Sequence, residues 1–300
     1  MSVSVIIPIH NAAPFLHETL ESVYDALVDG DELITVFDNC CDASSTVYEA
    51  WRNEKQIAQG ADVAFVAHHV NVRSISLSRN IGLDVATRKW VAFVDHDDLV
   101  APEMYKILTS TGDALRMDVV RCGYAKFCNT VDEVVYPDFS PAYYAFFGIF
   151  VWNGVLRRDS IDRYGIRFVP GYGEDYEFNL QLSRVIKSQH FVQNCFYFWR
   201  MHNENHHKKR SPSDFVDRVE SLIAHCGDYL LACPNAKASF VRWFTDYTEY
   251  LNNSFPVPFV SAALSGFQRH AVFFRQLSIG LSLEMSFRLA CVMKANAIAI

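Results

Sequence analysis

The chain has 300 residues, of which half are hydrophobic and 20% are charged, and its formal net charge is −7. This composition leaves little room for extended disorder and permits a sizeable core. The negative balance argues against a nucleic-acid partner, because a phosphate-binding surface normally carries excess lysine and arginine. The basic cluster at 206–210 fits either a solvated loop or a contact with phosphates or lipid headgroups.

The eight cysteines show no CxxC pair and no compact spacing typical of a zinc site. The first residues enter a strand pattern directly, without the charged and long apolar segments of a signal peptide. No stretch reaches the roughly 20 uninterrupted apolar residues of a membrane-spanning helix, and Leu277–Ile300 reads as amphipathic. We therefore expect a reduced, cytoplasmic protein, with peripheral attachment to the inner face of a membrane as the alternative.

The first hundred residues alternate short apolar runs with amphipathic segments. We expect strands at 3–9, 33–37, 63–66 and 90–94, and helices at 15–27, 44–59 and 78–86. Strands that alternate with helices imply parallel pairing through right-handed crossovers. The sequence therefore predicts an α/β fold, a Rossmann-like α/β/α sandwich with a mostly parallel sheet.

Beyond residue 102 this alternation weakens. We expect strands at 119–127 and 133–136, a short helix at 161–165 and a longer helix at 175–185. After residue 210 the pattern is helical without strands, with helices that begin near Pro212 and cover 235–251. We predict one domain over 1–210 and a C-terminal helical extension over 211–300.

Polar side chains follow three expected strands at the end where each strand finishes. These are His10, Asp38 and the run Asp95–Asp98. The carboxyl ends of parallel strands meet at one rim of an open α/β sheet, where ligands bind. The acids of Asp95–Asp98 would repel one another unless a cation compensated them, and their hard oxygens suit Mg²⁺ or Mn²⁺. An ordinary helix cap is the other interpretation of this run.

With these residues in place, the chain resembles the family-2 glycosyltransferases of the GT-A fold over about residues 2–205. Five ordered blocks carry the resemblance: Val3–Asn11, Thr35–Asp42, Ser78–Leu83, the DxD motif Asp95–Asp97 and Gly173–Asp175. The sequence departs from the family pattern at His10, where an aromatic residue is usual, and at Asn39, which replaces an acid. The resemblance implies a half that binds the nucleotide sugar (1–100) and a half that binds the acceptor (101–210).

The resemblance also implies a divalent cation, Mn²⁺ or Mg²⁺, at the donor phosphates. Asp97 would be its direct ligand, and Asp95 would contact the metal or the ribose. His202 is the candidate third ligand, because neutral imidazole binds Mn²⁺ beside carboxylates. His206 and His207 are its rivals, and an unliganded loop histidine is the alternative.

A further group of residues is expected to line the nucleotide: Pro8, His10, Asp38, Asn39, Arg79, Asp95 and His96. Asp38 would accept a hydrogen bond from the uracil N–H, although Asn39 leaves open which of the two residues reads the base. Arg79 would face the uracil or the phosphates, or would instead form a salt bridge with one of the acids. Pro8 and His10 would pack against the base, or His10 would lie on the surface without a ligand.

Asp175 is the candidate general base of an inverting transfer, because a helix N-terminus stabilises its anionic form. The alternative role is that of a helix cap. Glu174 would hold a neighbouring loop or an acceptor hydroxyl. Asp98 would support the metal site or cap the following turn.

The sequence thus predicts a metal-dependent, inverting glycosyltransferase that moves a hexosyl or N-acetylhexosaminyl group from a nucleotide diphosphate, UDP above all, to a saccharide hydroxyl. A bacterial surface polysaccharide or lipooligosaccharide is the expected acceptor. The alternatives are a non-catalytic sugar-nucleotide-binding protein and an Asp-x-Asp phosphohydrolase. The second of these is disfavoured, because the motif follows the fourth strand rather than the first.

The helical extension carries many apolar residues that could seal the protein's own core, form a homodimer, or lie on a membrane beside a glycolipid acceptor. They are Phe255, Phe259, Phe267, Phe273, Phe274, Leu277, Leu281, Met285, Leu289 and Val292. Basic residues are sparse in this segment, which favours packing or dimerisation over attraction to anionic lipid.

Overall fold

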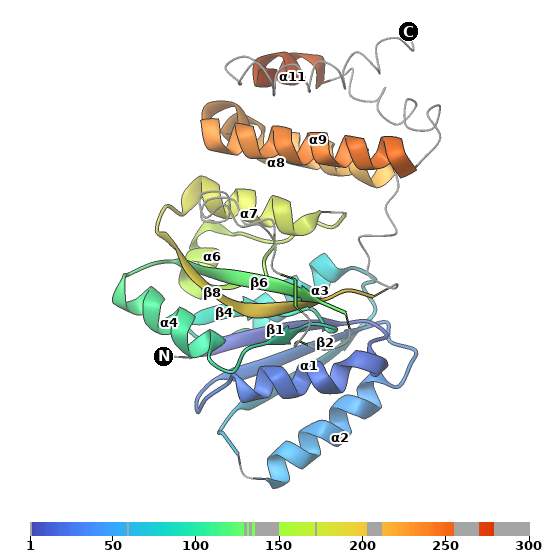
Figure 1. Cartoon of the computed structure of the whole chain (residues 1–300), viewed down its shortest axis with the longest axis vertical. Coiled ribbons are helices and arrows are strands. Elements are labelled where there is room, and N and C mark those ends of the chain that lie inside the picture. The colour runs from blue at the N-terminus through green and yellow to red at the C-terminus, as the bar shows by residue number, and fades with distance from the viewer. Residues whose placement is uncertain are drawn as a thin grey trace. The chain divides into compact units, whose positions relative to one another are not determined.

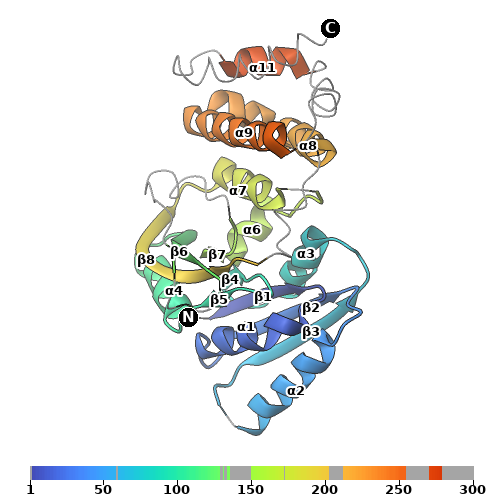
Figure 2. The same cartoon turned by 45° about the vertical axis from the view of Figure 1, so that its right-hand side comes forward.

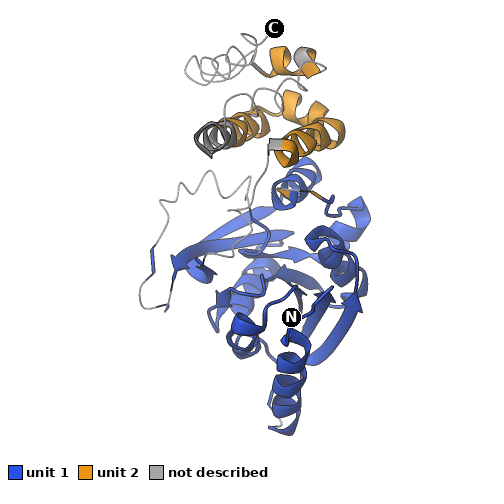
Figure 3. Ribbon diagram, turned by 90° about the vertical axis from the view of Figure 1, so that its right-hand side faces the viewer, with its two compact units in different colours: residues 1–170, 174–203 blue, residues 171–173, 204–300 orange. Residues whose placement is uncertain are grey.

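The structure is a computed structural model, which describes residues 2–58, 60–128, 131, 134–135, 150–171, 173–202, 212–254 and 270–278. The chain divides into two compact units, shown in different colours in Figure 3. The first comprises residues 1–170 and 174–203, and the second comprises residues 171–173 and 204–300.

The first unit is built on one sheet, which can be followed in Figure 1. Its strands are β1 (Val3–Ile9), β2 (Glu32–Asp38), β3 (Ala64–Val70), β4 (Trp90–Phe93), β5 (Leu99–Val100), β6 (Val119–Phe127), β7 (Gly154–Arg157) and β8 (Gln189–Arg200). They lie in the order β3-β2-β1-β4-β7-β6-β8-β5. The four strands at the β3 end pair in parallel, whereas β7 pairs antiparallel with both β4 and β6. The sheet is therefore mixed but mostly parallel, as predicted.

Helices cover both faces of this sheet (Figure 2). They are α1 (Ala13–Asp25), α2 (Ser44–Ile57), α3 (Ile75–Val85), α4 (Met104–Ala114), α6 (Arg158–Tyr164) and α7 (Glu174–Val185). Buried residues of α1, α2 and α4 pack in one apolar cluster, and those of α3, α6 and α7 pack in another. Alternate residues of β1 serve the two clusters, with Val5 and Ile7 in the first and Ile6 in the second. This arrangement confirms the predicted α/β/α sandwich.

Several boundaries differ from the predictions for identifiable reasons. α1 begins at Ala13, because Pro14 fits the first helical turn. α3 begins at Ile75 rather than 78, because the Ser74 side chain accepts a hydrogen bond from the Leu77 N–H as an N-cap. α4 and the short strands β5 and β7 were not predicted, and no strand was expected at 189–196, the first part of β8. Of the strand expected at 133–136, the structure describes 134–135, where Val135 forms an isolated bridge to Lys126.

The second unit contains the helices α8 (Pro212–Ala232), α9 (Pro234–Ser254) and α11 (Ala271–Ser278). Phe273 and Phe274 of α11 are buried against Phe240 and Phe244 of α9, and Leu277 is fully buried. These three residues of the extension thus pack into the core of their own unit. No helix in the described part of the chain is both long and apolar enough to span a membrane.

Some predicted features lie outside the described residues. They are Glu133, Tyr136, the basic cluster with His206 and His207, and Phe255, Phe259, Phe267, Leu281, Met285, Leu289 and Val292.

Candidate active site

The predicted polar residues do gather at the carboxyl rim of the parallel strands. β1 ends at Ile9 immediately before His10, β2 ends with Asp38, and Asp95 follows shortly after β4. The His10 ring Nδ1 lies 2.7 Å from the Asp38 carbonyl oxygen, and the His96 ring Nδ1 lies 3.2 Å from that of Pro8. A carbonyl oxygen only accepts, so each of these ring nitrogens carries the proton. These contacts join the loop after β1 to the end of β2, and the loop after β4 to the last part of β1.

Asp38 holds the loop between β3 and α3. Its carboxylate accepts hydrogen bonds from the backbone N–H groups of Val72, Arg73 and Ser74 at 2.8 to 2.9 Å and from the Ser78 hydroxyl at 3.3 Å. Burial acts to raise the pKa of Asp38, but the hydrogen bonds outweigh it and the pKa is lowered. A carboxylate has about four acceptor positions, so a base N–H would have to displace one of these donors. The base-reading role predicted for Asp38 therefore competes with a structural one.

Asn39 lies next to it in a left-handed backbone conformation (φ 52°) and is exposed. Its own N–H donates to the Val70 carbonyl oxygen at 2.9 Å. Asparagine tolerates this conformation better than most residues do, which explains its presence at this turn.

Two of the predicted metal ligands meet directly. The His202 Nε2 lies 2.7 Å from Asp97 Oδ2, and both side chains keep a small exposed fraction. Phe15 packs on the His202 ring with 4.7 Å between centroids. Asp95 points instead to Arg79, and no group of three potential ligands converges among the described residues. A carboxylate and an imidazole fit a Mn²⁺ or Mg²⁺ ion that takes its other ligands from donor phosphates and water.

Arg79 connects the two predicted halves of the site. Its side chain is only 2% exposed, and its Nη2 contacts Asp95 Oδ1 at 2.8 Å. Its Nη1 contacts Glu174 Oε1 at 3.0 Å and Asp175 Oδ1 at 2.6 Å. Burial alone would lower the pKa of Arg79, but the three carboxylates raise it above its usual value. The salt-bridged alternative given for Arg79 is thus the arrangement in this structure, and it involves three acids rather than one.

Asp175 sits in the first turn of α7 with both carboxylate oxygens engaged. Oδ1 meets Arg79, and Oδ2 accepts a hydrogen bond from the Val151 N–H at 3.3 Å. Burial raises the pKa of Asp175 to about 7, assisted by the nearby charge of Glu174 and opposed by Arg79. A carboxyl group that titrates near neutrality is suited to accept a proton as a general base.

Asp98 has a structural environment. It is fully buried, accepting hydrogen bonds from the Tyr197 hydroxyl at 2.6 Å and from the Arg200 N–H at 2.8 Å. Burial raises the pKa of Asp98 well above its usual range, and the charges of Asp97 and Asp95 act in the same direction. Of the two roles left open for Asp98, the contacts match the one that holds the turn in place.

Tyr197 and Arg200 were missed as contributors to this site. The Tyr197 hydroxyl also accepts a hydrogen bond from the Asp95 N–H at 3.2 Å. Arg200 donates from Nε to the Asp97 carbonyl oxygen at 2.7 Å and from Nη2 to Glu18 at 2.6 Å. Both residues lie on β8 and precede the predicted ligand His202 by five and two positions. Their closeness to His202 along the chain was the available signal.

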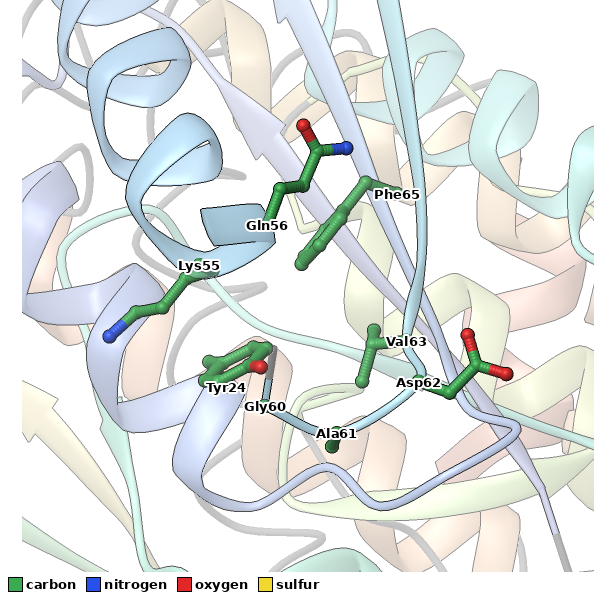
Figure 4. Close-up of a pocket in the computed structure, with 8 residues that line it drawn as sticks. All are labelled: Tyr24, Lys55, Gln56, Gly60, Ala61, Asp62, Val63 and Phe65. Atoms are coloured by element: carbon green, nitrogen blue, oxygen red, sulfur yellow. The ribbon is translucent and has the colours of Figure 1, made fainter. Parts of the chain in front are cut away.

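A separate hollow of about 350 Å³ lies between α2 and the start of β3 (Figure 4). Its lining residues are Tyr24, Lys55, Gln56, Gly60, Ala61, Asp62, Val63 and Phe65. It is at the amino end of β3, whereas ligands of open α/β sheets bind at the carboxyl ends of the strands. It therefore does not belong to the site described above.

The chain is similar to known glycosyltransferases in sequence and in fold. The family model described as "Glycosyl transferase family 2" matches residues 4–204. The uncharacterized glycosyltransferase EpsJ of Bacillus subtilis is 26% identical over 215 residues, which are 66% of this chain and 60% of that protein. The chain thus spans less than two thirds of the length of this relative.

Two solved structures share the fold. S. aureus TarS (residues 1–349, in complex with UDP-GlcNAc) superposes with a TM-score of 0.75 at 16% identity, covering 99% of this chain and 88% of that one. The mannosyltransferase PcManGT of Pyrobaculum calidifontis, in complex with GDP-Man and Mn²⁺, gives 0.55 at 16% identity, covering 98% and 86%.

The sheet and its flanking helices have the GT-A fold of these solved structures. Because the family model covers two thirds of the sequence, the chain belongs to glycosyl transferase family 2.

Proposed function

We propose that this enzyme transfers a sugar from a nucleotide diphosphate, most simply a UDP-sugar, to a saccharide hydroxyl with inversion at the anomeric carbon. The observation that carries this proposal is the Arg79 cluster, which joins Asp95 of the DxD motif to Asp175 at the start of α7. An inverting transfer needs a carboxylate at the donor site, here Asp95 after β4, and a second carboxyl group that can accept a proton near neutral pH, here Asp175.

Asp175 acts as the general base in this proposal. As the acceptor oxygen attacks the anomeric carbon from the face opposite the nucleotide, its proton passes to Asp175. The new glycosidic C–O bond forms while the bond from the anomeric carbon to the phosphate oxygen breaks. The Val151 N–H and Arg79 hold the two carboxylate oxygens, which orients the base. Glu174 contributes by pairing with Arg79.

Asp97 and His202 would hold the divalent cation, and Asp95 lies two residues before Asp97 in the loop after β4. A divalent cation at this place stabilises the negative charge that develops on the leaving diphosphate. Mn²⁺ in the PcManGT complex and UDP-GlcNAc in the TarS complex support this assignment of cofactor and donor class. Pro8, His10, Asn39 and His96 line the same rim and are proposed to contact the nucleotide.

We assign donor binding to residues 1–100 and acceptor binding to residues 101–210, within a domain over 1–210 that the helical extension over 211–300 follows. The proposed acceptor is a saccharide of a bacterial surface polysaccharide or lipooligosaccharide. Dimerisation through the extension and peripheral attachment to the inner face of a membrane remain the two proposals for its further contacts.

A screen of UDP-sugars, with GDP-mannose as a second nucleotide class, for Mn²⁺-dependent release of the nucleotide diphosphate tests this function. We expect Asp97→Ala and Asp175→Asn each to remove most of the turnover. Asp113→Asn is the matched control, since it changes an acid that pairs with Lys89 and Arg157 outside the site. Full activity in both site variants would overturn the assignment, and nucleotide binding without release would indicate a non-catalytic protein.

A further inference from the structure

Arg121 is a buried arginine of β6 that has no carboxylate in salt-bridge contact among the described residues, although the charge of Asp175 acts on it. It is 3% exposed, and its Nη1 donates to the Phe150 carbonyl oxygen at 2.8 Å and to Asn153 Oδ1 at 3.3 Å. Its Nη2 donates to Asn179 Oδ1 at 2.5 Å. Burial lowers the pKa of Arg121 to about 10, so the group stays charged at neutral pH. Three neutral oxygens contact the two terminal nitrogens of this guanidinium, an arrangement that matches its fork and that an ammonium group would not reproduce.

The strand that pairs with Arg121 has a glycine opposite it, which allows the two strands to approach closely. Gly154 is its partner in the antiparallel ladder between β6 and β7. A Cβ atom at Gly154 would lie 2.5 Å from the Val120 carbonyl oxygen and 3.2 Å from Arg121 Cγ. Asn153 adds two more hydrogen bonds between the strands. Its side chain donates to the Cys122 carbonyl oxygen at 2.9 Å, and its backbone carbonyl oxygen accepts from the Cys122 N–H at 2.8 Å. The segment before β7 is therefore held tightly against β6.

The peptide group between Phe150 and Val151 connects Arg121 to Asp175 by hydrogen bonds. The Phe150 carbonyl oxygen, which Arg121 holds, also accepts a hydrogen bond from Asn179 Nδ2 at 3.1 Å. The N–H of the same peptide group belongs to Val151 and donates to Asp175 Oδ2 at 3.3 Å. A peptide group is planar and its C=O and N–H point in opposite directions, so the donors that fix the carbonyl also set the direction of the N–H.

We infer that Arg121 is a positioning residue for the general base, acting through the peptide group between Phe150 and Val151. Asn179 lies one turn beyond Asp175 on α7 and ties the same carbonyl to the helix that carries the base. Arg79 takes one oxygen of the Asp175 carboxylate, and the N–H aimed by Arg121 takes the other. The consequence for catalysis rests on the proposed function, whereas the positioning itself does not.

The experiment compares the full-length protein with Arg121→Met and Arg121→Lys. Amide hydrogen exchange at Val151 reports the positioning, and donor turnover in Mn²⁺ reports its effect. For Arg121→Met we expect exchange at Val151 to be about tenfold faster, as after loss of a hydrogen bond, and kcat to fall about 10- to 100-fold. The donor KM should stay within about twofold, because the donor site is untouched. Arg121→Lys should be intermediate, since an ammonium group keeps the charge but not the fork.

Arg157→Met is the matched control, because Arg157 lies on β7 and pairs with Asp113 and Asp118 instead. It should lower the melting temperature but leave exchange at Val151 and kcat unchanged. If Arg121→Met does not fold, Asn179→Ala removes a donor to the same carbonyl and is judged by the same readouts.

Unchanged exchange at Val151, or an equal loss of kcat in Arg157→Met, would overturn the inference. If the unmodified enzyme released no nucleotide from any donor, the proposed function would fail. The exchange measurement would still decide whether Arg121 positions the peptide group.

Discussion

Replacing Arg79 by glutamine is expected to move the pH dependence of the reaction towards higher pH. Arg79 Nη1 lies 2.6 Å from Asp175 Oδ1, and its charge lowers the pKa of Asp175, which burial raises to about 7. Two unit charges about 4 Å apart interact by about 4 kcal/mol at an effective dielectric constant near 20. That energy corresponds to about 3 pKa units and is an upper bound, because Arg79 is shared with Asp95 and Glu174.

A rise of about 2 units lies within the usual range for loss of an opposite charge. The ionised fraction of Asp175 at pH 7 would then fall from about one half to about one hundredth, so kcat/KM at this pH would fall about fiftyfold. The assay is kcat/KM for nucleotide release between pH 5.5 and 9.5, since this ratio reports ionisations of the free enzyme.

Two further variants make the test specific. Arg79→Lys keeps the charge and should leave the acidic limb of the profile near that of the unmodified enzyme. Glu174→Gln removes a neighbouring negative charge that raises the pKa of Asp175, so it should move the limb to lower pH. An acidic limb that stays in place in Arg79→Gln, in a folded variant that still binds the donor, would refute the role of Asp175 as the base.

Three other predictions follow from contacts at the rim. After treatment with EDTA, Asp97→Ala should abolish the stimulation of nucleotide release by added Mn²⁺, while His202→Gln should raise the Mn²⁺ concentration needed for it. Mn²⁺ dependences equal to that of the unmodified enzyme in both variants would contradict the assignment. Tyr197→Phe removes the hydroxyl that donates to the buried carboxylate of Asp98 at 2.6 Å. It should lower the free energy of unfolding by about 1–3 kcal/mol in urea denaturation, whereas the same substitution at a surface tyrosine should not. Asp38→Asn should lower the free energy of unfolding by about 2 kcal/mol at pH 7. Because the folded pKa of Asp38 is lowered, its contribution is present above the unfolded pKa and is lost as pH falls through the folded one, so the two proteins should converge in acid.

Much of the fold follows from local patterns in the sequence. The apolar runs of β1, β2 and β4 are buried in full, and the amphipathic segments between them form α1, α2 and α3. Hydrophobic period and turn residues act over a few residues, so they predict such elements before any tertiary contact is known. The same patterns did not indicate β5, which has two residues, or β7, whose four residues begin with glycine and end with arginine.

The sequence by itself also determined which acids end at the carboxyl rim, because the end of each apolar run is a local property of the sequence. Only the tertiary structure decided how these acids are used. Arg79 is 16 residues from Asp95 but 96 from Asp175, and Tyr197 is 99 residues from Asp98. Whether a buried charge binds a ligand, orients a base or holds a turn depends on neighbours brought together by chain crossovers, and no local pattern records those distances.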